Sequence, residues 1–430
     1  MYRIIMNDLI EWYEEKQDKV LLLKGAVGVG KTWVINDFAN GFYKHVFYIN
    51  IEKEEEAAAL FKQGSEVKVD KLIAALCIYC DQIYEEGKTL FVFDEVQVNG
   101  NVVEAIMSMK RHRPELSICI IASTIGEMIY EKDYVNLLYN CFLFPMTFEE
   151  FLVANKEQEL CKYIEKQKLE PIAPQYIEKI TEYMKLFYIT GGMPAVVSEY
   201  IKNHDLSRVD TTLRVQLNQC QEYLIQNAPE IYAEKVCKIW NSIPCQFDKE
   251  NHKFMYQYVD ENARAREYES SVNWLVSTGL VRKVNRVTDG ITPLADQVDT
   301  KSFELYHLDH GLLRMMCDIP YDRLGDGKNL LEDVHGALIE QYVLSELTMN
   351  PSIGTLYFWV SSATAKVDFV FEDNEDIVPV TVQPQIRRKA QNMKVFRSKY
   401  DNRMSLRISM DPLSFQKSVL NVPLYGLWAF

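Results

Sequence analysis

The sequence has 430 residues, of which 48% are hydrophobic and 25% charged. This length leaves room for roughly two to four domains of about 150 residues, and the apolar fraction excludes a mainly disordered chain. The 47 Lys and Arg against 61 Asp and Glu give a net charge of −14. This balance argues against a surface that binds DNA over its whole extent, but it allows a local basic groove.

No segment is typical of a secretion signal or a membrane span. The N-terminal residues lack a basic stretch followed by a long apolar one, and no run approaches the ~18 apolar residues of a membrane helix. Nine cysteines without regular spacing indicate reduced thiols. Neither the pair Cys77 and Cys80 nor the pair His307 and His310 has the companion ligands of a metal site. We therefore expect a cytoplasmic protein without membrane contact.

The first 150 residues alternate between strand and helix patterns. Apolar or β-rich segments at residues 20–24, 45–51, 89–93 and 117–122 are separated by helical stretches. Strands separated by helices predict a parallel sheet with right-handed crossovers.

The rest of the chain follows a different pattern. Residues 147–234 are mainly helical, and residues 217–315 alternate helices with two short β-rich segments, which suits a winged-helix-like module. The last hundred residues return to β-rich segments with one helix, as in a second α/β unit. We therefore predict three domains, at residues 1–150, 151–315 and 316–430.

A glycine-rich loop follows the first predicted strand. Residues 25–32 read GAVGVGKT and match the P-loop pattern G-x-x-x-x-G-K-[ST]. The glycines let backbone N–H groups point at phosphate oxygens, and the following helix adds the positive end of its dipole. We expect Lys31 to neutralise the β- and γ-phosphates of ATP, and Thr32 to bind Mg²⁺.

An apolar strand ending in two acids lies some 60 residues further on. Residues 90–95 read LFVFDE, the Walker B pattern. We expect Asp94 to hold the metal through its water shell and Glu95 to act as the general base on the attacking water. A Glu directly after the Asp favours an enzyme that hydrolyses ATP over a protein that only holds it. The predicted catalytic residues are therefore Lys31 and Glu95, and the predicted metal ligands are Thr32 and Asp94.

Polar residues also follow the next predicted strand, at Ser123 and Thr124. Such a position can sense the γ-phosphate, although a simple strand-end cap is the alternative. Arg111 and Arg113 are candidates for an arginine finger, and the alternative is that both lie on a solvated surface. The nucleotide-binding residues that we predict are Gly25, Val27, Gly28, Val29, Gly30, Lys31, Thr32, Trp33 and Ser123.

The order of these motifs resembles a large class of prokaryotic AAA+-type predicted ATPases, which join an N-terminal P-loop domain to a C-terminal region of unknown function. The resemblance covers nearly the whole chain. Besides GAVGVGKT, it rests on FVFDEVQ (residues 91–97), FPMTFEEFL (144–152), TGGMPAVV (190–197), the segment 253–281, ELYHLDHGLL (304–313), GALIEQYVLSEL (336–347) and FWVSSATAKVDFVFE (358–372). The chain departs from the class in having Val27 and Gly28 where members often have a basic-polar pair. It also lacks the Arg that often precedes FPMTFEEFL.

The resemblance also implies that the C-terminal unit is similar to the PD-(D/E)XK nuclease fold. Such sites need an Asp, followed by a strand with Glu-x-Lys, to hold Mg²⁺ and stabilise charge. Asp368 matches the Asp, but Thr381 and Gln383 stand at the positions of the Glu and the Lys. Glu340, the remaining carboxylate candidate, is distant in sequence. We therefore expect an α/β fold with an AAA+-like P-loop sheet, a helical and winged-helix-like module, and a small restriction-endonuclease-like domain that has lost nuclease activity.

A basic segment lies near the C-terminus, where residues 387–407 hold eight Lys and Arg and a single acid, Asp401. It is either a solvated helix or a contact for nucleic acid or an acidic partner. Three functions follow as hypotheses: an ATPase whose nucleotide state controls its C-terminal module, a DNA-associated ATPase, and a nucleotide-gated scaffold for a protein partner. The oligomeric state stays open.

Overall fold

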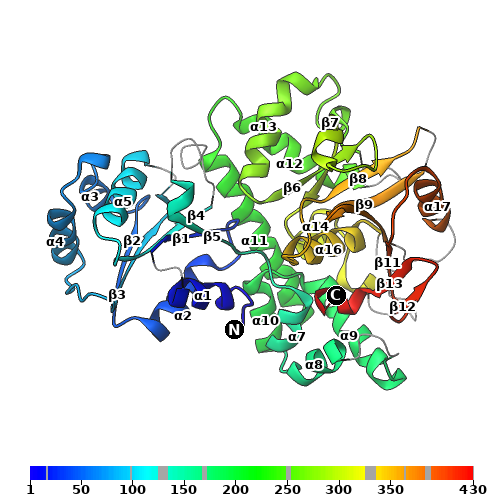
Figure 1. Ribbon diagram of the computed structural model, residues 1–430, viewed down its shortest axis with the longest axis horizontal. Coiled ribbons are helices and arrows are strands. Elements are labelled where there is room, and N and C mark those ends of the chain that lie inside the picture. Colours follow the sequence, from blue (N-terminus) through cyan, green and yellow to red (C-terminus); the bar gives the residue numbers. More distant parts are fainter. Residues whose placement is uncertain are drawn as a thin grey trace. The chain divides into compact units, whose positions relative to one another are not determined.

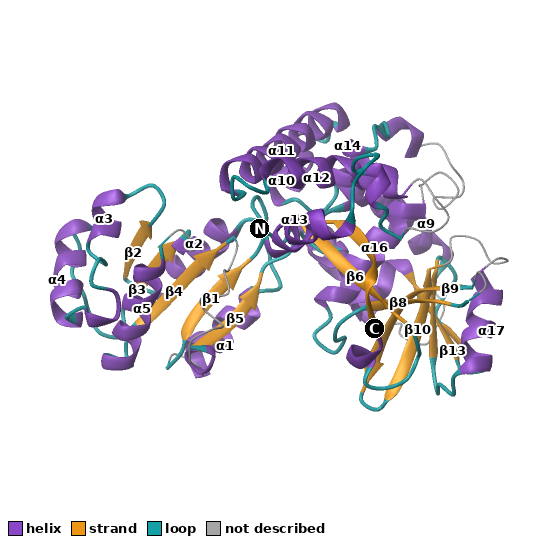
Figure 2. Ribbon diagram, turned by 90° about the horizontal axis from the view of Figure 1, so that it is seen from above, coloured by secondary structure: helices purple, strands orange, loops and turns teal. Residues whose placement is uncertain are grey.

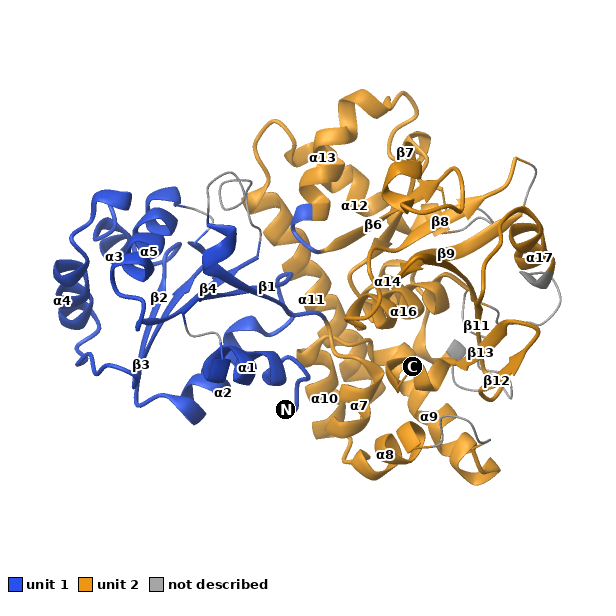
Figure 3. Cartoon of the chain, in the orientation of Figure 1, with its two compact units in different colours: residues 1–144, 277–279 blue, residues 145–276, 280–430 orange. Residues whose placement is uncertain are grey.

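A computed structural model describes residues 1–15, 18–96, 99–123, 134–166, 172–247, 253–324, 336–362, 365–382 and 389–429. The chain forms two compact units. The first comprises residues 1–144 and 277–279, and the second comprises residues 145–276 and 280–430 (Figure 3). The division of the second unit at residue 315 stays a prediction.

The first unit is built on a parallel sheet, as the sequence predicts. Its described residues give five strands in the order β2-β3-β4-β1-β5, and every neighbouring pair is parallel (Figure 1). The strands are β1 (Val20–Lys24), β2 (His45–Asn50), β3 (Thr89–Asp94), β4 (Ser117–Ala122) and β5 (Leu138–Phe142). All residues of β1, β3 and β4 are buried. This burial explains why their sequences are continuous apolar runs rather than alternating patterns.

Helices connect these strands and supply the core. They are α1 (Met6–Glu15), α2 (Lys31–Phe42), α3 (Glu55–Ala59), α4 (Val69–Tyr79) and α5 (Gly100–His112). The apolar sides of α4 and α5 pack on alternate residues of the central strands, among them Leu22, Phe91 and Ile120. The carboxyl ends of parallel strands lie at the same edge of a sheet, and β3, β4 and β1 are neighbours. The segments that follow these three strands therefore lie close together.

The second unit combines helices with a mixed sheet (Figure 2). Its helices are α7 (Phe148–Ala154), α8 (Gln158–Lys166), α9 (Pro174–Thr190), α10 (Pro194–Asn203), α11 (Leu206–Asn227), α12 (Ala233–Phe247), α13 (Ala265–Ser277), α14 (His310–Met316), α16 (Gly336–Met349) and α17 (Lys389–Lys399). The predicted helical region is thus present. Among the described residues, no helix is both long and apolar enough to cross a membrane.

The sheet of the second unit has eight strands within the described ranges, in the order β12-β13-β11-β10-β9-β8-β6-β7. They are β6 (Val281–Val287), β7 (Val298–His307), β8 (Tyr357–Val360), β9 (Lys366–Asp373), β10 (Asp376–Val382), β11 (Ser405–Ser409), β12 (Ser414–Gln416) and β13 (Val419–Pro423). Strand β6 pairs antiparallel with β7 and parallel with β8. The two strands predicted for the winged-helix-like module therefore belong to the same sheet as the C-terminal strands.

Candidate functional site

The glycine-rich loop runs from the end of β1 to the start of α2. Gly28 and Gly30 have φ angles of 85° and 94°, a left-handed conformation that glycine adopts without steric cost. Gly25 is needed for a different reason, since a Cβ atom there would lie 2.4 Å from the carbonyl oxygen of Leu143. The glycines of the motif thus shape the loop and allow its close approach to the segment after β5.

Lys31 lies at the centre of this loop and is buried. Its Nζ donates hydrogen bonds to the carbonyl oxygens of Gly25 (2.8 Å) and Ala26 (3.1 Å) and to Oγ of Ser123 (2.9 Å). The pKa of Lys31 lies below its ordinary value, because burial lowers it by more than the nearby carboxylates of Glu95 and Asp94 raise it. The ammonium group therefore joins the loop to Ser123 at the end of β4.

The two acids of the Walker B segment lie at the same edge of the sheet. Asp94 ends β3, and its Oδ2 accepts a hydrogen bond from Oγ1 of Thr32 at 3.3 Å. The Glu95 carboxylate accepts a hydrogen bond from Ser123 Oγ at 3.1 Å. Glu95 also has a φ of 54°. This conformation is strained for a residue other than glycine, and such strain is concentrated at functional sites.

Most of the predicted site residues thus converge. The loop residues, Lys31, Thr32, Asp94, Glu95 and Ser123 lie together at the sheet edge. The side chain of Val29 is buried, and that of Trp33 is exposed. Thr124 and Gln97 lie outside the described residues.

The two arginine-finger candidates have other contacts. The guanidinium of Arg111 lies 5.1 Å from the ring centre of Tyr134. Arg113 forms an ion pair with Asp70 at 2.8 Å and another with Glu115. These contacts favour the surface interpretation of both residues.

Two residues of the site are missed by the sequence motifs. The Tyr48 hydroxyl donates a hydrogen bond to Oδ2 of Asp94, and Arg3 donates from Nη1 to the carbonyl oxygen of Val29 at 3.0 Å. The position of Tyr48 near the end of a strand beside β3 is a signal that could have found it. Arg3 lies 26 residues from Val29 in sequence, so no local pattern indicates its role.

The oxygen atoms at this edge fit Mg²⁺. Asp94 and Thr32 present a carboxylate and a hydroxyl oxygen within hydrogen-bond distance of each other, and Mg²⁺ prefers oxygen ligands. The described residues contain no group of three or more His, Cys, Asp or Glu that could hold a metal. Mg²⁺ does not need such a group, because it is commonly bound by one or two protein oxygens together with water and substrate phosphates.

The second unit contains a cluster of charges, formed by the buried carboxyl groups of Glu304, Glu340 and Asp368 and the partly buried Lys366. Lys366 Nζ lies 2.7 Å from Glu304 Oε1, and Asp368 Oδ2 accepts a hydrogen bond from the backbone N–H of Val382 at 2.8 Å. Burial lowers the pKa of Lys366, but the three carboxylates together raise it above its ordinary value. Thr381 is also buried, whereas Gln383 lies outside the described residues.

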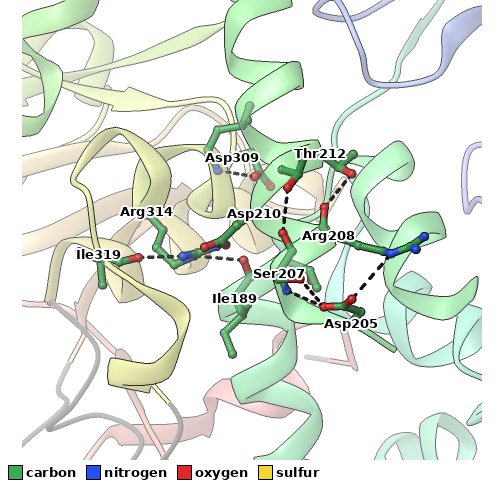
Figure 4. A network of polar contacts seen from close by, with 12 residues as sticks. Ile189, Asp205, Ser207, Arg208, Asp210, Thr212, Asp309, Arg314 and Ile319 are labelled. Atoms are coloured by element: carbon green, nitrogen blue, oxygen red, sulfur yellow. Dashed lines mark hydrogen bonds and ion pairs between the residues drawn. The ribbon is translucent and has the colours of Figure 1, made fainter. Parts of the chain in front are cut away.

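Two of the motifs far apart in sequence meet in the second unit. Asp309, of the ELYHLDHGLL segment, accepts hydrogen bonds from the backbone N–H of Gly192 (2.7 Å) and of Leu312 (3.0 Å). Arg314 extends the junction, since its Nε donates to the carbonyl oxygen of Ile189 at 3.1 Å and its Nη2 pairs with Asp210 (Figure 4). The TGGMPAVV and ELYHLDHGLL segments therefore form a structural junction.

Three family models match the chain. Residues 17–152 match the AAA domain, residues 181–323 a domain of unknown function (DUF8612), and residues 335–425 another domain of unknown function (DUF4143). Comparison with curated proteins gives no match.

Solved structures with similarity to the chain include several ATPases. A Walker-type ATPase of Pyrococcus abyssi has a TM-score of 0.43 and 14% identity, over 73% of this chain and 95% of its own. A signal transduction ATPase with numerous domains, from Pyrococcus horikoshii, has a TM-score of 0.30 and 14% identity, over 82% of this chain and 46% of its own. The Drosophila ORC structure bound to DNA has a TM-score of 0.28 and 14% identity, over 72% and 92%. The match of residues 17–152 to the AAA domain, together with the parallel sheet and the glycine-rich loop after β1, identifies a P-loop ATPase domain of the AAA type in the first unit.

Proposed function

We propose that the protein hydrolyses ATP and that its nucleotide state controls the second unit. The observation that carries the first part is the convergence of Lys31, Ser123 and Glu95. Lys31 Nζ and Ser123 Oγ are 2.9 Å apart, and Ser123 Oγ lies 3.1 Å from the Glu95 carboxylate. A cation for phosphates, a polar group and a carboxylate base thus lie at one sheet edge.

Each residue has a task in this proposal. The backbone N–H groups of residues 25–32 bind the phosphates of ATP, and Lys31 compensates their charge. Thr32 and Asp94 hold Mg²⁺, which neutralises charge on the phosphate oxygens when bound. Glu95 accepts a proton from the water that attacks the γ-phosphate, and Ser123 orients the Glu95 carboxylate.

The second part of the proposal rests on the segment that joins the units. The backbone N–H of Leu143 donates to the carbonyl oxygen of Lys24, at the start of the loop, at 2.7 Å. Three residues later, in the second unit, the N–H of Met146 donates to the carbonyl oxygen of Gly192 at 2.6 Å. Gly192 in turn binds Asp309. A shift of the phosphate loop would therefore act on a short segment that is fixed at both ends.

Phosphate release from ATP with Mg²⁺ tests the first part. We expect the wild-type chain to release phosphate and Lys31→Ala to lose nucleotide binding. Lys62→Ala, a change on the exposed surface of the same unit, is the matched control. Equal turnover in Lys31→Ala and Lys62→Ala would refute the proposal.

Amide hydrogen exchange with and without nucleotide tests the second part. We expect ATP to slow exchange in the loop and also at Met146 and Gly192. Protection confined to the first unit would contradict control of the second unit.

A DNA-associated ATPase is the second candidate, with a winged-helix-like module and an inactive nuclease-like domain. Helix α17 and the residues after it hold the basic side chains that favour it, although Lys399 pairs with Asp289 and Arg407 bonds to Asn421. Arg387 and Arg388 lie outside the described residues. Salt-dependent DNA binding that is weakened by Lys394→Glu and Arg403→Glu would support this candidate, and failure to bind DNA at low salt would exclude it.

A further inference from the structure

One polar contact of the site is not used by the motifs: the hydrogen bond from Tyr48 to Asp94. Tyr48 lies on β2, which pairs with β3 so that Tyr48 is opposite Val92 and Asn50 is opposite Asp94. Because side chains alternate along a strand, Tyr48 and Asn50 share one face of the sheet with Asp94. Tyr48 is half-buried there, so its hydroxyl approaches Asp94 from the neighbouring strand.

The Asp94 carboxylate is fixed on both of its oxygens. Oδ1 accepts the backbone N–H of Glu95 at 2.9 Å. Oδ2 accepts the Tyr48 hydroxyl and Oγ1 of Thr32. Tyr48 and Thr32 thus donate to the same carboxylate oxygen, one from β2 and the other from the first turn of α2. The phenol therefore holds the same Asp94 oxygen that meets the Thr32 hydroxyl, and these are the two oxygen groups that Mg²⁺ would use.

We infer that Tyr48 is a positioning residue for the metal: it holds Asp94 in the orientation in which the carboxylate meets Thr32. This inference rests on the proposed binding of ATP with Mg²⁺. A hydrogen bond to a charged acceptor is stronger than one between neutral groups, and partners behind a metal ligand fix its direction. Without the phenol hydroxyl, Asp94 keeps its position in the strand but loses one of the donors that orient its side chain.

Metal-dependent binding of a nucleotide tests this role apart from catalysis. The probe is a fluorescent ATP analogue that is not hydrolysed, bound in excess EDTA and then at increasing Mg²⁺ concentrations. We expect Tyr48→Phe to need roughly tenfold more Mg²⁺ for half-maximal tightening, while its affinity in EDTA equals that of the wild type. The ring remains in place, so thermal unfolding without ligand should change little.

Tyr79→Phe is the matched control, because the Tyr79 hydroxyl also donates to a carboxylate, that of Glu54, at 2.8 Å. This variant should keep the Mg²⁺ dependence of the wild type. An unchanged Mg²⁺ dependence in Tyr48→Phe would overturn the inference, and so would tighter Mg²⁺ binding, which would mean that the phenol competes with the metal. If the wild-type chain binds no nucleotide in either condition, the proposed function itself fails.

Discussion

Arg3 donates a hydrogen bond from Nη2 to the carbonyl oxygen of Phe144 at 2.5 Å. Phe144 is the last residue of the first unit before the chain continues into the second. The other guanidinium nitrogen, Nη1, binds the carbonyl oxygen of Val29 in the phosphate loop. One buried side chain therefore fixes both the loop and the segment that leaves the unit.

Replacing Arg3 should weaken both structures. In Arg3→Met the two carbonyl oxygens lose their donor, and a buried unsatisfied group costs about 1–3 kcal/mol. We expect a lower unfolding temperature and weaker ATP binding, measured by thermal unfolding with and without nucleotide. Lys44→Met removes only a surface ion pair with Glu85 and should change neither property. Nucleotide affinity in Arg3→Met equal to that of Lys44→Met would show that Arg3 does not support the loop.

The close packing of Gly192 predicts a strong effect of a single methyl group. A Cβ atom there would lie 2.2 Å from the carbonyl oxygen of Met146. We expect Gly192→Ala to destabilise the second unit by about 2 kcal/mol or more, as measured by chemical denaturation. The control is Gly336→Ala at the start of α16, where nothing lies within 4 Å of the added atom. Equal midpoints for the two variants would contradict this packing.

Replacing Arg314 should destabilise the second unit. Its side chain is 1% exposed, it pairs with Asp210, and it donates to the carbonyl oxygens of Ile189 and Ile319. Asp210 is 27% exposed and can be solvated when its partner is removed, but the carbonyl oxygens of Ile189 and Ile319 would lose a donor, and a buried group left without its hydrogen bond costs about 1–3 kcal/mol. Arg314→Met should therefore lower the denaturant midpoint clearly. Arg208→Met, which removes exposed ion pairs of 3.7 Å, should have little effect. The prediction fails if both variants unfold at the same midpoint.

The buried carboxyl group of Glu346 should make the stability of the second unit depend on pH. Burial raises the pKa of Glu346 to about 8, and burial also raises that of the nearby Glu149 to about 7. The folded state therefore holds protons more tightly than the unfolded state, whose carboxyls titrate near the ordinary value of about 4.3. Stability should fall as the pH rises from about 4.5 to 8. The loss should reach a few kcal/mol, since each unit of pKa difference corresponds to about 1.4 kcal/mol.

The measurement is the unfolding midpoint at several pH values. Glu346→Gln keeps an oxygen that can accept the N–H of Phe148, which Glu346 binds at 2.9 Å, but it carries no proton to lose. It should therefore be less sensitive to pH than the wild type and gain stability relative to it at pH 8. A wild-type midpoint that rises across this range would give the opposite sign and refute the assignment.

The predictability of this chain from its sequence depends on how local the signals are. The parallel sheet was predictable because β1, β3 and β4 are continuous apolar runs separated by helices. The loop and Asp94 were predictable because phosphate and metal binding require fixed spacings. The sequence motifs do not include Arg3 and Tyr48, whose contacts join residues 26 and 46 positions apart. Tyr48 could be inferred only from its place near the end of a strand beside β3, and Arg3 has no such signal.

The second unit shows the same limit at the level of whole strands. The two β-rich segments that become β6 and β7 suit a winged-helix-like module, but their pattern contains nothing that specifies the pairing of β6 with β8. The sequence pattern also does not indicate that Lys366 belongs to the charge cluster. The nuclease pattern would have a lysine at position 383, where this chain has Gln383, and nothing in the sequence indicates that Lys366 lies beside Glu304, three strands away in the sheet order.

The rate of phosphate release by Glu95→Gln, compared with its affinity for ATP, tests ATP hydrolysis at this site most directly. The substituted amide would keep the size of the Glu95 side chain and an oxygen that can accept from Ser123, but it could not take a proton from water. We predict that the variant binds ATP as tightly as the wild type and releases phosphate about 100-fold or more slowly. Equal rates of phosphate release in the two proteins would contradict the role of Glu95 and, with it, the proposed mechanism.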